Sequence, residues 1–280
     1  MAEIVSTGIE RLDEALIDEK GITLGSCVLI EGSSGSGKEL LSKQFASAGV
    51  GSENVVYFST DETSDELIDT FEQYRWPTDL RIVNVGTQYF EKVLSRELQA
   101  SRFKQEGLSV SELRNLGSYG STSDQINFVA DMTYEISKLR SPFRVVVDSL
   151  DFFMQYYNPI EVLSAMRTIK EYAQANGGSV MYTISEGSHE ARIHSQIEAI
   201  CDVVIQLEVG RMAAEFENRL IIKKIRNHPE KAAVMIYAVT EHGITPEMIT
   251  RVAYRLYWFS LRGFGFLLYG YSLQVRLSEI

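Results

Sequence analysis

Short apolar runs alternate with segments of helical periodicity along most of the chain. The runs are rich in β-branched and aromatic residues, which is typical of strands buried on both faces of a sheet. They occupy 27–30, 55–58, 80–85, 143–147 and 178–185. Apolar residues recur at helical spacing between them, in segments that include 40–46, 64–76, 128–136 and 159–175. This alternation predicts an α/β fold with a mainly parallel central sheet flanked by helices.

The pattern changes in the last third of the chain. The segments 201–209, 216–226 and 232–240 are strand-like and are separated by short polar breaks. We therefore expect antiparallel strands added at the C-terminal side of the sheet. At the other end of the chain, Ser6 or Thr7 is available to cap a short helix.

Two stretches do not fit the alternation. The interval that ends at Pro142 is longer than one crossover helix needs, and we interpret 86–121 as a helical insertion or lid. An ordinary pair of packed surface helices explains it equally well. The segment 253–280 is apolar and aromatic, but Arg262 and several glycines argue against a membrane span. Extra strands, an interaction tail and an abnormal extension stay open for it, and we expect the main domain to cover 1–252.

Charge and composition narrow the class of protein. The net charge is −11, which argues against broad binding to nucleic acids or anionic membranes. The N-terminus has neither the basic segment nor the long apolar core of a signal peptide, so the cytoplasm is the expected compartment. Cys27 and Cys201 each lie in an apolar run, and we expect reduced core residues rather than a disulfide or a metal pair. The histidines without metal-ligand spacing to these cysteines are His189, His194, His228 and His242.

The most specific motif is the glycine-rich turn between the first apolar run and the helix after it. It fits the pattern Gly-x-x-x-x-Gly-Lys and consists of Gly32, Ser33, Ser34, Gly35, Ser36, Gly37 and Lys38. Strand, turn and helix form the context of a phosphate-binding loop, in which backbone N–H groups and the helix N-terminus bind an anion. Lys38 would reach the terminal phosphates. Glu39 follows, where Ser or Thr would normally hold Mg²⁺.

Acidic residues follow two other strands at the same predicted edge of the sheet. Asp148 ends an aliphatic strand, as in a Walker B element that holds Mg²⁺ through water, although many buried strands end in Asp. Asp61 and Glu62 could orient a water that attacks the γ-phosphate. Helix capping explains either of these two residues equally well when each is taken singly. Ser185 ends a further strand, and together with the glycine loop the set becomes specific.

These motifs, in this order, resemble those of the KaiC-like ATPases of the RecA superfamily, including single-domain archaeal proteins of that type. The resemblance spans roughly 5–250 and is carried by 6–9, 32–38, 58–63, 145–150, 223–226 and 240–244. It implies a RecA-like P-loop NTPase core that binds ATP and Mg²⁺. It also implies a homo-oligomer, such as a hexameric ring, with ATP at the subunit interfaces.

The resemblance also implies roles for individual residues. Lys38 would bind phosphate, Asp148 would serve Mg²⁺, and Glu62 with Asp61 would activate water. Lys224 and Arg226 match a Lys-x-Arg strand whose side chains reach the γ-phosphate of a neighbouring subunit. Without the resemblance, 223–226 would first be interpreted as a solvated strand face.

Glu39 departs from the family pattern. Mg²⁺ accepts carboxylate oxygens, so Glu39 joins Asp148 as an expected metal ligand. It also places negative charge beside the phosphates, and at an effective dielectric of about 20, like charges 4 Å apart repel by roughly 4 kcal/mol. This repulsion is offset wherever the metal lies between the charges. We therefore expect retained ATP binding with slow or metal-altered hydrolysis.

Three functions compete on this evidence. The first is a regulatory or signalling ATPase with a protein partner that the sequence does not identify, and the second is a non-hydrolysing, nucleotide-dependent scaffold. The third is a DNA recombination ATPase. The stretches 150–157 and 186–192, where RecA relatives bind DNA, together hold one arginine, one histidine and three acidic residues. Phosphate contacts need clustered Lys or Arg, so nucleic acid is the least expected partner.

Overall fold

The computed structural model describes residues 3–94, 101, 105, 127–212 and 215–248. Most of the predicted insertion beyond residue 94, and all of the segment 253–280, lie outside the described residues. The insertion is described at its start, where helix α4 (Val85–Tyr89) continues into a π-helical turn (Phe90–Leu94). Within the described ranges, no helix has the length and apolarity needed to cross a membrane.

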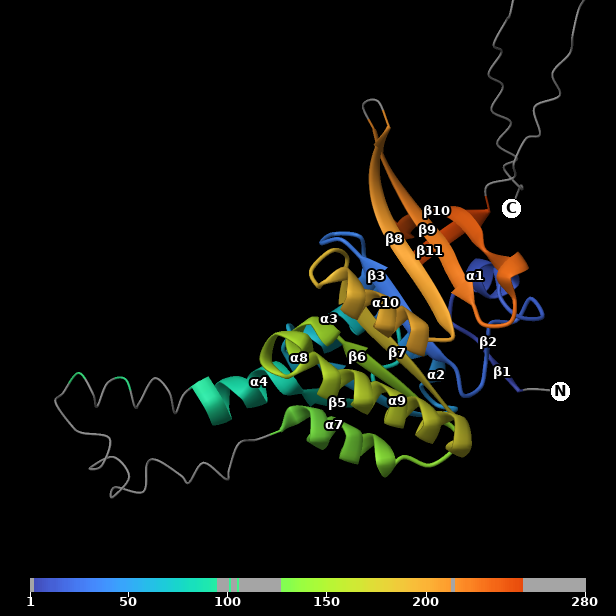
Figure 1. The fold of residues 1–280 in the computed structure, drawn as a ribbon. Helices are drawn as coiled ribbons and strands as arrows, with labels where there is room; N and C mark the ends of the chain where they lie inside the picture. The colour runs from blue at the N-terminus through green and yellow to red at the C-terminus, as the bar shows by residue number, and fades with distance from the viewer. Residues whose placement is uncertain (1–2, 95–100, 102–104, 106–126, 213–214, 249–280) are drawn as a thin grey trace, which may run out of the picture. The chain divides into compact units, whose positions relative to one another are not determined.

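A nine-stranded mixed sheet forms the centre of the fold (Figure 1), with the strand order β11-β10-β9-β8-β3-β7-β6-β4-β5. The strands that run parallel to one another are β3 (Cys27–Gly32), β4 (Asn54–Ser59), β5 (Arg81–Asn84), β6 (Phe143–Asp148), β7 (Gly178–Ser185) and β8 (Val203–Met212). The antiparallel strands are β9 (Glu215–Ile225), β10 (Ala233–Thr240) and β11 (Gly243–Met248). The predicted α/β fold, with a mainly parallel sheet and antiparallel strands on its C-terminal side, is confirmed.

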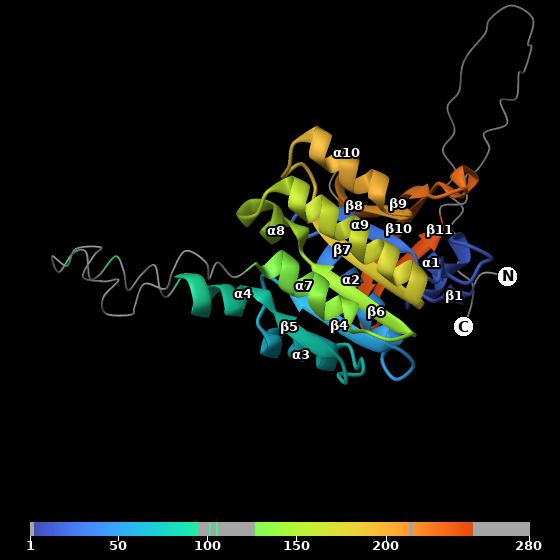
Figure 2. The same ribbon diagram turned by 60° about the horizontal axis from the view of Figure 1, so that its bottom comes forward.

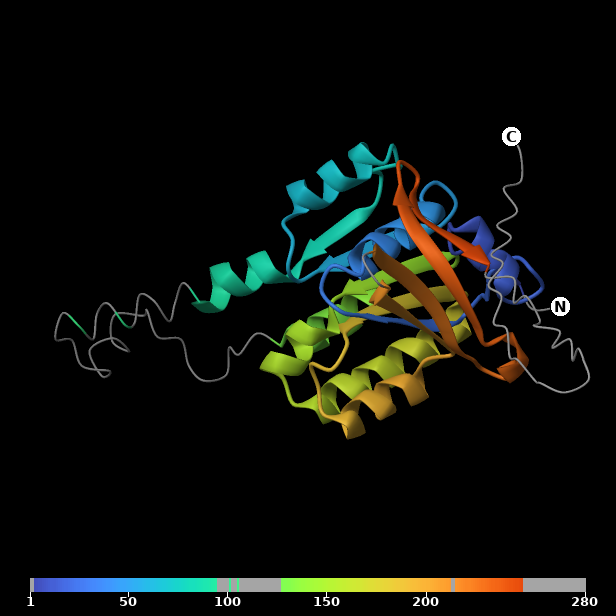
Figure 3. The ribbon, with the colours of Figure 1, turned by 90° about the horizontal axis from the view of Figure 1, so that it is seen from above.

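Helices cover both faces of this sheet (Figures 2 and 3). One face packs against α7 (Phe128–Ser137), α8 (Leu150–Tyr156), α9 (Pro159–Asn176) and α10 (Ala191–Ile200). The other face packs against α1 (Glu10–Ala15), α2 (Lys38–Gly49) and α3 (Ser64–Gln73). Side chains of β3 alternate between the two layers, because Leu29 joins the first cluster while Val28 and Ile30 join the second. The sheet is therefore buried on both faces where the phosphate loop begins.

Two helix starts were expected from the sequence, and one of them differs in the structure. Asn158 caps α9 by accepting a hydrogen bond from the N–H of Ile160, and Pro159 occupies the first turn. The N-terminal helix begins later than expected, because Ile9 is its N-cap residue. Ser6 and Thr7 do not cap it, since both hydroxyls donate to the carboxylate of Asp13, at 2.5 and 2.6 Å.

Two β-structural features were not predicted from the sequence. A small antiparallel pair, β1 (Ile4–Val5) and β2 (Ile22–Thr23), lies outside the main sheet. Strand β11 contains Pro246, which cannot donate to a ladder and which masks the strand pattern in the sequence. The strand forms because β11 is at the edge of the sheet, where one side needs no partner.

The two cysteines meet inside the fold. Cys27 at the start of β3 and Cys201 after α10 are buried and unbridged, with sulfur atoms 3.4 Å apart. Their separation of 174 positions in sequence hid this contact. Burial raises the pKa of the Cys201 thiol well above its usual value, so the thiol stays protonated and packs as a small apolar group.

Candidate functional site

The glycine loop joins β3 to α2 in the conformation that a phosphate-binding loop requires. Gly35 and Gly37 have φ values of 80° and 78°, which L-amino acids with side chains rarely adopt. A Cβ atom on Gly32 would lie 2.3 Å from the hydroxyl of Ser36, so only glycine fits there. Gly37 is the N-cap of α2, and the helix therefore begins at Lys38, directly after the loop.

Side chains of the loop divide into exposed and buried groups. Ser33, Ser34 and Gly35 are exposed, whereas Ser36 and Lys38 are buried. Tyr237 of β10 donates its hydroxyl to the carbonyl oxygen of Ser36 at 2.5 Å. Burial raises the pKa of Tyr237 to about 12, so this donor stays protonated. The loop is thus supported by a side chain 201 positions later in the sequence. The loop sequence alone does not indicate this contact.

Glu39 lies beside the lysine that precedes it. Its carboxylate forms an ion pair with the ammonium group of Lys38. The Glu39 side chain is 38% exposed, whereas that of Lys38 is 6% exposed. In this arrangement the loop lysine already has an anionic partner, which a bound phosphate would have to replace or share.

Asp148, at the end of β6, is surrounded by hydroxyl groups. It accepts hydrogen bonds from Thr183 of β7 at 2.5 Å and from Tyr57 of β4 at 2.6 Å. Ser42 of α2 donates to it at 3.4 Å and also contacts the hydroxyl of Tyr57. Burial raises the pKa of Asp148, and the nearby charge of Glu39 adds to that effect, while the donors Thr183 and Tyr57 oppose it.

Glu62 pairs with a buried cation on α2. The ammonium group of Lys43, whose side chain is 4% exposed, lies 2.6 and 2.7 Å from the two carboxylate oxygens of Glu62. Asp61 is exposed and accepts a hydrogen bond from the hydroxyl of Thr60 at 2.9 Å. Neither acid caps α3.

The cap of α3 is a capping box made by two other residues. The hydroxyl of Thr63 accepts from the N–H of Glu66, and the Glu66 carboxylate accepts from the N–H of Thr63. The alternative interpretation of Asp61 and Glu62 as capping residues is therefore wrong. The carboxylate of Glu62 is instead held toward α2.

Helix α2 brings several of these groups together. Glu39, Ser42 and Lys43 are spaced three and four residues apart, so they lie on one side of the helix. Through Ser42 and Lys43, α2 contacts Asp148 and Glu62, and Glu39 pairs with Lys38 at the start of the same helix. The predicted loop, the aspartate after β6 and the glutamate after β4 thus adjoin one helix.

Lys224 and Arg226 lie elsewhere in the chain. Lys224 is opposite Val204 of β8, three residues before Leu207, which is the position opposite Gly32. Both side chains are therefore displaced toward the other end of the parallel strands. Within one chain they do not join the phosphate loop.

Both cations are engaged at the C-terminus of α10. The ammonium group of Lys224 donates to the carbonyl oxygens of Glu198 and Cys201, each at 2.7 Å. Arg226 pairs with Asp202, with Nε and Oδ1 2.6 Å apart. Burial and the neighbouring Arg226 lower the pKa of Lys224. The solvated face that the sequence pattern favoured at first agrees with the exposure of Arg226, whereas Lys224 is only partly exposed because it donates to the end of α10.

Of the two stretches weighed as DNA-binding loops, 150–157 is mostly packed, whereas most of 186–192 is exposed. Phe152 of α8 contacts Tyr89, Phe128 and Tyr156 in an aromatic cluster with ring centroids 4.9 to 6.4 Å apart. Asp151 accepts hydrogen bonds from the N–H of Ser185 at 2.9 Å and pairs with His189 at 2.7 Å. Burial alone would raise the pKa of Asp151, but these donors lower it below its ordinary value.

Comparisons with known proteins show the family to which the chain belongs. The family model described as "ATPase: KaiC" matches residues 5–249. The circadian clock oscillator protein KaiC of Synechococcus elongatus is 29% identical over 248 residues, which make up 85% of this chain and 43% of that protein. The archaeal flagellar ATP-binding protein FlaH of Sulfolobus acidocaldarius is 24% identical over 209 residues, or 74% of this chain and 80% of that protein.

A solved structure shares the fold. A KaiC-like protein from the hyperthermophilic archaeon Pyrococcus horikoshii superposes with a TM-score of 0.60 at 18% sequence identity. The match covers 88% of this chain and 100% of the other. The chain spans less than half the length of the KaiC clock proteins it matches, at 43% and 41% of two of them.

Proposed function

Because the chain belongs to the KaiC family of ATPases, we propose that it binds ATP at the loop 32–38 and hydrolyses it slowly. The observation that carries the proposal is the loop itself, with Gly37 as the N-cap of α2 and Lys38 buried directly behind it. FlaH, a relative that covers most of the same length, is named as an ATP-binding protein. Binding is thus the part of the proposal with the broadest support.

The donors around the loop suit a nucleotide with Mg²⁺. The hydroxyl of Ser36 is buried and has no hydrogen-bond partner among the described residues, so it is available to a phosphate oxygen. Lys38 would bind the terminal phosphates after exchanging its contact with Glu39. Asp148 and Glu39 would hold Mg²⁺, which takes carboxylate oxygens and keeps several of its waters. The metal would neutralise charge on the phosphates when bound.

Two contacts support slow hydrolysis. In the proposed mechanism Glu62, with Asp61 beside it, accepts a proton from the attacking water. Glu62 is held by Lys43 in an ion pair, which must loosen before the carboxylate can act as a base. Glu39 adds a negative charge where the family pattern has a neutral hydroxyl. Both features reduce turnover without removing the phosphate site.

The biological role follows from slow turnover. A slow ATPase suits regulation or signalling in the cytoplasm, with a protein partner that responds to the bound nucleotide. The second candidate is a nucleotide-dependent scaffold without turnover, which the same pair of Lys43 and Glu62 favours. Recombination is not proposed, because the segments after β6 and β7 are poor in cations.

Nucleotide binding and turnover in three proteins test the proposal. We expect wild type to bind ATP and the Lys38→Ala variant to bind it at least tenfold more weakly. An exposed lysine outside the loop, changed in Lys20→Ala, should leave binding as in wild type. The Glu39→Thr variant restores the hydroxyl and should raise turnover in Mg²⁺. Absence of ATP binding would contradict the proposal as a whole, and brisk turnover unaffected by Glu39→Thr would contradict its slow-hydrolysis part.

A further inference from the structure

Glu31 is a buried carboxylate directly before the phosphate loop. Its side chain is 2% exposed, and it projects from β3 away from α2, on the face opposite to that of its neighbour Ile30. Burying a carboxylate is costly unless cations or donors compensate. The groups around Glu31 therefore show how its negative charge is compensated.

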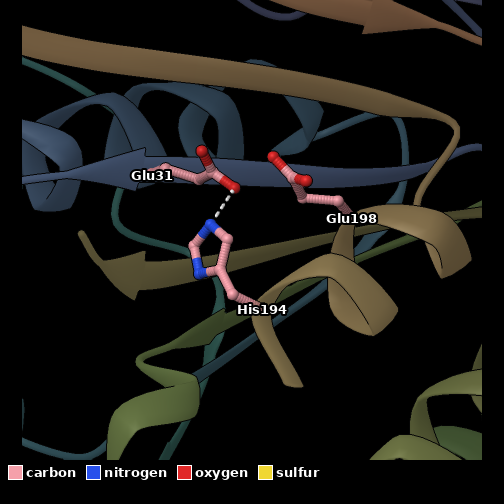
Figure 4. Close-up of side chains that lie close together, drawn as sticks. All are labelled: Glu31, His194 and Glu198. Atoms are coloured by element: carbon pink, nitrogen blue, oxygen red, sulfur yellow. Dashed lines mark ion pairs between the residues drawn. The ribbon is translucent and has the colours of Figure 1, made fainter. Parts of the chain in front are cut away.

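Two side chains of α10 meet Glu31 there (Figure 4). His194 and Glu198 are one helical turn apart and point from α10 toward β3. Ligand atoms of Glu31, His194 and Glu198 all lie within 4.8 Å of one another. Lys223 of β9 also contacts both acids, at 2.9 Å from Glu31 and 2.5 Å from Glu198.

Lys223 accounts for one oxygen of Glu31 and leaves the other without a donor. Its ammonium group lies on Oε2. Oε1 is buried and accepts no hydrogen bond from any described residue, although Nε2 of His194 is 2.9 Å away. The imidazole thus faces the oxygen at close range without the alignment of a hydrogen bond. Oε1 therefore has an ion-pair partner but no hydrogen-bond donor, and a cation shared by the imidazole and the carboxylate would satisfy both groups.

We propose that Glu31, His194 and Glu198 form a binding site for a divalent transition-metal ion such as Zn²⁺. Two ligands at the tetrahedral angle, each about 2.1 Å from an ion, are about 3.4 Å apart, so Nε2 and Oε1, now 2.9 Å apart, need to separate only slightly to admit an ion. One imidazole and two carboxylates are ligands that Zn²⁺ and its first-row neighbours accept. Glu198 reaches the ion by a rotamer change that its partial exposure allows.

Lys223 acts as the competitor of the metal in this site. Without metal, its ammonium group balances the charge of both carboxylates. A divalent ion takes over that balance, and the flexible lysine side chain, which is 33% exposed, turns toward solvent. The site therefore exchanges one cation for another.

The proposed site is separate from the nucleotide's Mg²⁺. Asp148 contacts Ser42 on α2, whereas Glu31 contacts α10 and β9 across the opposite face of the sheet. The metal site and the proposed ATP site can therefore be tested independently. A metal bound there would link α10 to Glu31 of β3, directly before Gly32.

Zinc titration of the purified chain tests the inference. The protein is treated with a chelator, dialysed, and titrated with Zn²⁺ alone in a calorimeter, with nucleotide left out. We expect one Zn²⁺ per chain in wild type and at least about tenfold weaker binding in His194→Ala and in Glu198→Gln. Lys223→Met should bind Zn²⁺ more tightly than wild type, because the competing cation is gone.

The control is a histidine outside the cluster. His228 pairs with Glu230 on the surface, and His228→Ala should bind Zn²⁺ as wild type does. Circular dichroism shows whether each variant is folded, and Glu198→Gln, which keeps its shape and is partly exposed, serves if His194→Ala does not fold. Equal Zn²⁺ affinity in wild type, Glu198→Gln and His228→Ala, or no binding by wild type, would overturn the inference.

Discussion

At the scale of single residues, Lys43 has the strongest influence on the proposed chemistry. Lys43 is a buried residue of α2, and its ammonium group contacts both carboxylate oxygens of Glu62. A carboxylate with both oxygens in an ion pair is held in place, and neither oxygen is free to contact a water that attacks ATP. The pair thus holds the proposed base in an inactive arrangement.

Replacing this lysine should release the base. We expect Lys43→Met to raise ATP turnover several-fold, because methionine keeps the apolar stem and removes the charge. Glu62→Gln should lower turnover by about 100-fold, the usual contribution of a general base. Steady-state hydrolysis of wild type, both variants and the double variant measures the effects. A double variant as active as Lys43→Met would show that Glu62 is not the base.

Asp148 makes stability depend on pH. Burial raises its pKa in the folded protein above the ordinary value of 3.8, so the folded state holds the proton more tightly than the unfolded chain. The resulting stabilisation is present below the unfolded pKa and is lost as pH rises through the folded pKa. Asp148→Asn cannot lose a proton. As pH rises above about 4, the urea midpoint of this variant should therefore rise relative to that of wild type, and parallel curves of midpoint against pH would contradict this.

At the scale of elements, cationic side chains from other segments contact the C-terminal end of α10. Lys170 of α9 donates to the carbonyl oxygen of Ile200 at 2.7 Å and pairs with Asp202 at 2.5 Å. Lys224 and Arg226 donate to further carbonyl oxygens of the same helix end, those of Glu198 and Ala199. The last carbonyls of a helix lack internal partners and carry partial negative charge, so this arrangement stabilises α10.

The buried member of this set should matter most for stability. We expect Lys170→Met to lower the free energy of unfolding by about 3 kcal/mol, because Asp202 is left buried with one partner fewer. Lys138→Met removes an exposed pair with Glu135, and it should lower the free energy of unfolding much less than Lys170→Met does. Urea unfolding of both variants makes the comparison. Equal losses would mean that Lys170 is not acting through its buried contacts.

At the scale of the whole molecule, the separation of Lys224 and Arg226 from the phosphate loop favours an assembly. A single chain cannot bring them to its own loop, so their proposed role toward γ-phosphate requires a neighbouring subunit, as in a ring. Arg226 is the better candidate, since its side chain is 46% exposed. Lys224 is tied more closely to α10.

An assembly makes turnover depend on concentration. We expect wild type to form oligomers in ATP, by light scattering, with turnover per chain rising with protein concentration. Arg226→Ala should keep ATP binding and lose most of that rise. Turnover per chain that is the same in dilute and concentrated wild type, and in Arg226→Ala, would contradict an interface role.

The fold was predictable where local sequence determines structure. Strands buried on both faces are continuous apolar runs, and α9 is bounded by Asn158 with Pro159 at one end and by Gly177, in the left-handed conformation, at the other. The edge strand β11 escaped prediction because Pro246 interrupts its pattern. The start of α1 was also missed, because the hydroxyl of Ser6 donates to Asp13 instead of capping the helix.

The candidate site was predictable only in part, for a different reason. The glycine loop is one continuous segment, so its sequence is enough. The contacts of Asp148 with Tyr57 and Thr183 arise because β6 lies between β4 and β7, an order that sequence pattern does not provide. The meeting of Glu31 with His194 likewise depends on where α10 crosses the sheet. The catalytic and binding roles of these residues stay predictions.

Helix α2 is also fastened at a point beyond the proposed site. Gln44 accepts a hydrogen bond from the N–H of Ile244 in β11 at 2.9 Å and donates to the carbonyl oxygen of Gly8 at 3.3 Å. A helix moves as a rigid rod, so a phosphate that shifts the start of α2 would shift Gln44 with it. Binding of phosphate at the loop would then displace β11 and the segment at Gly8. A partner protein that contacts either segment would respond to the bound nucleotide.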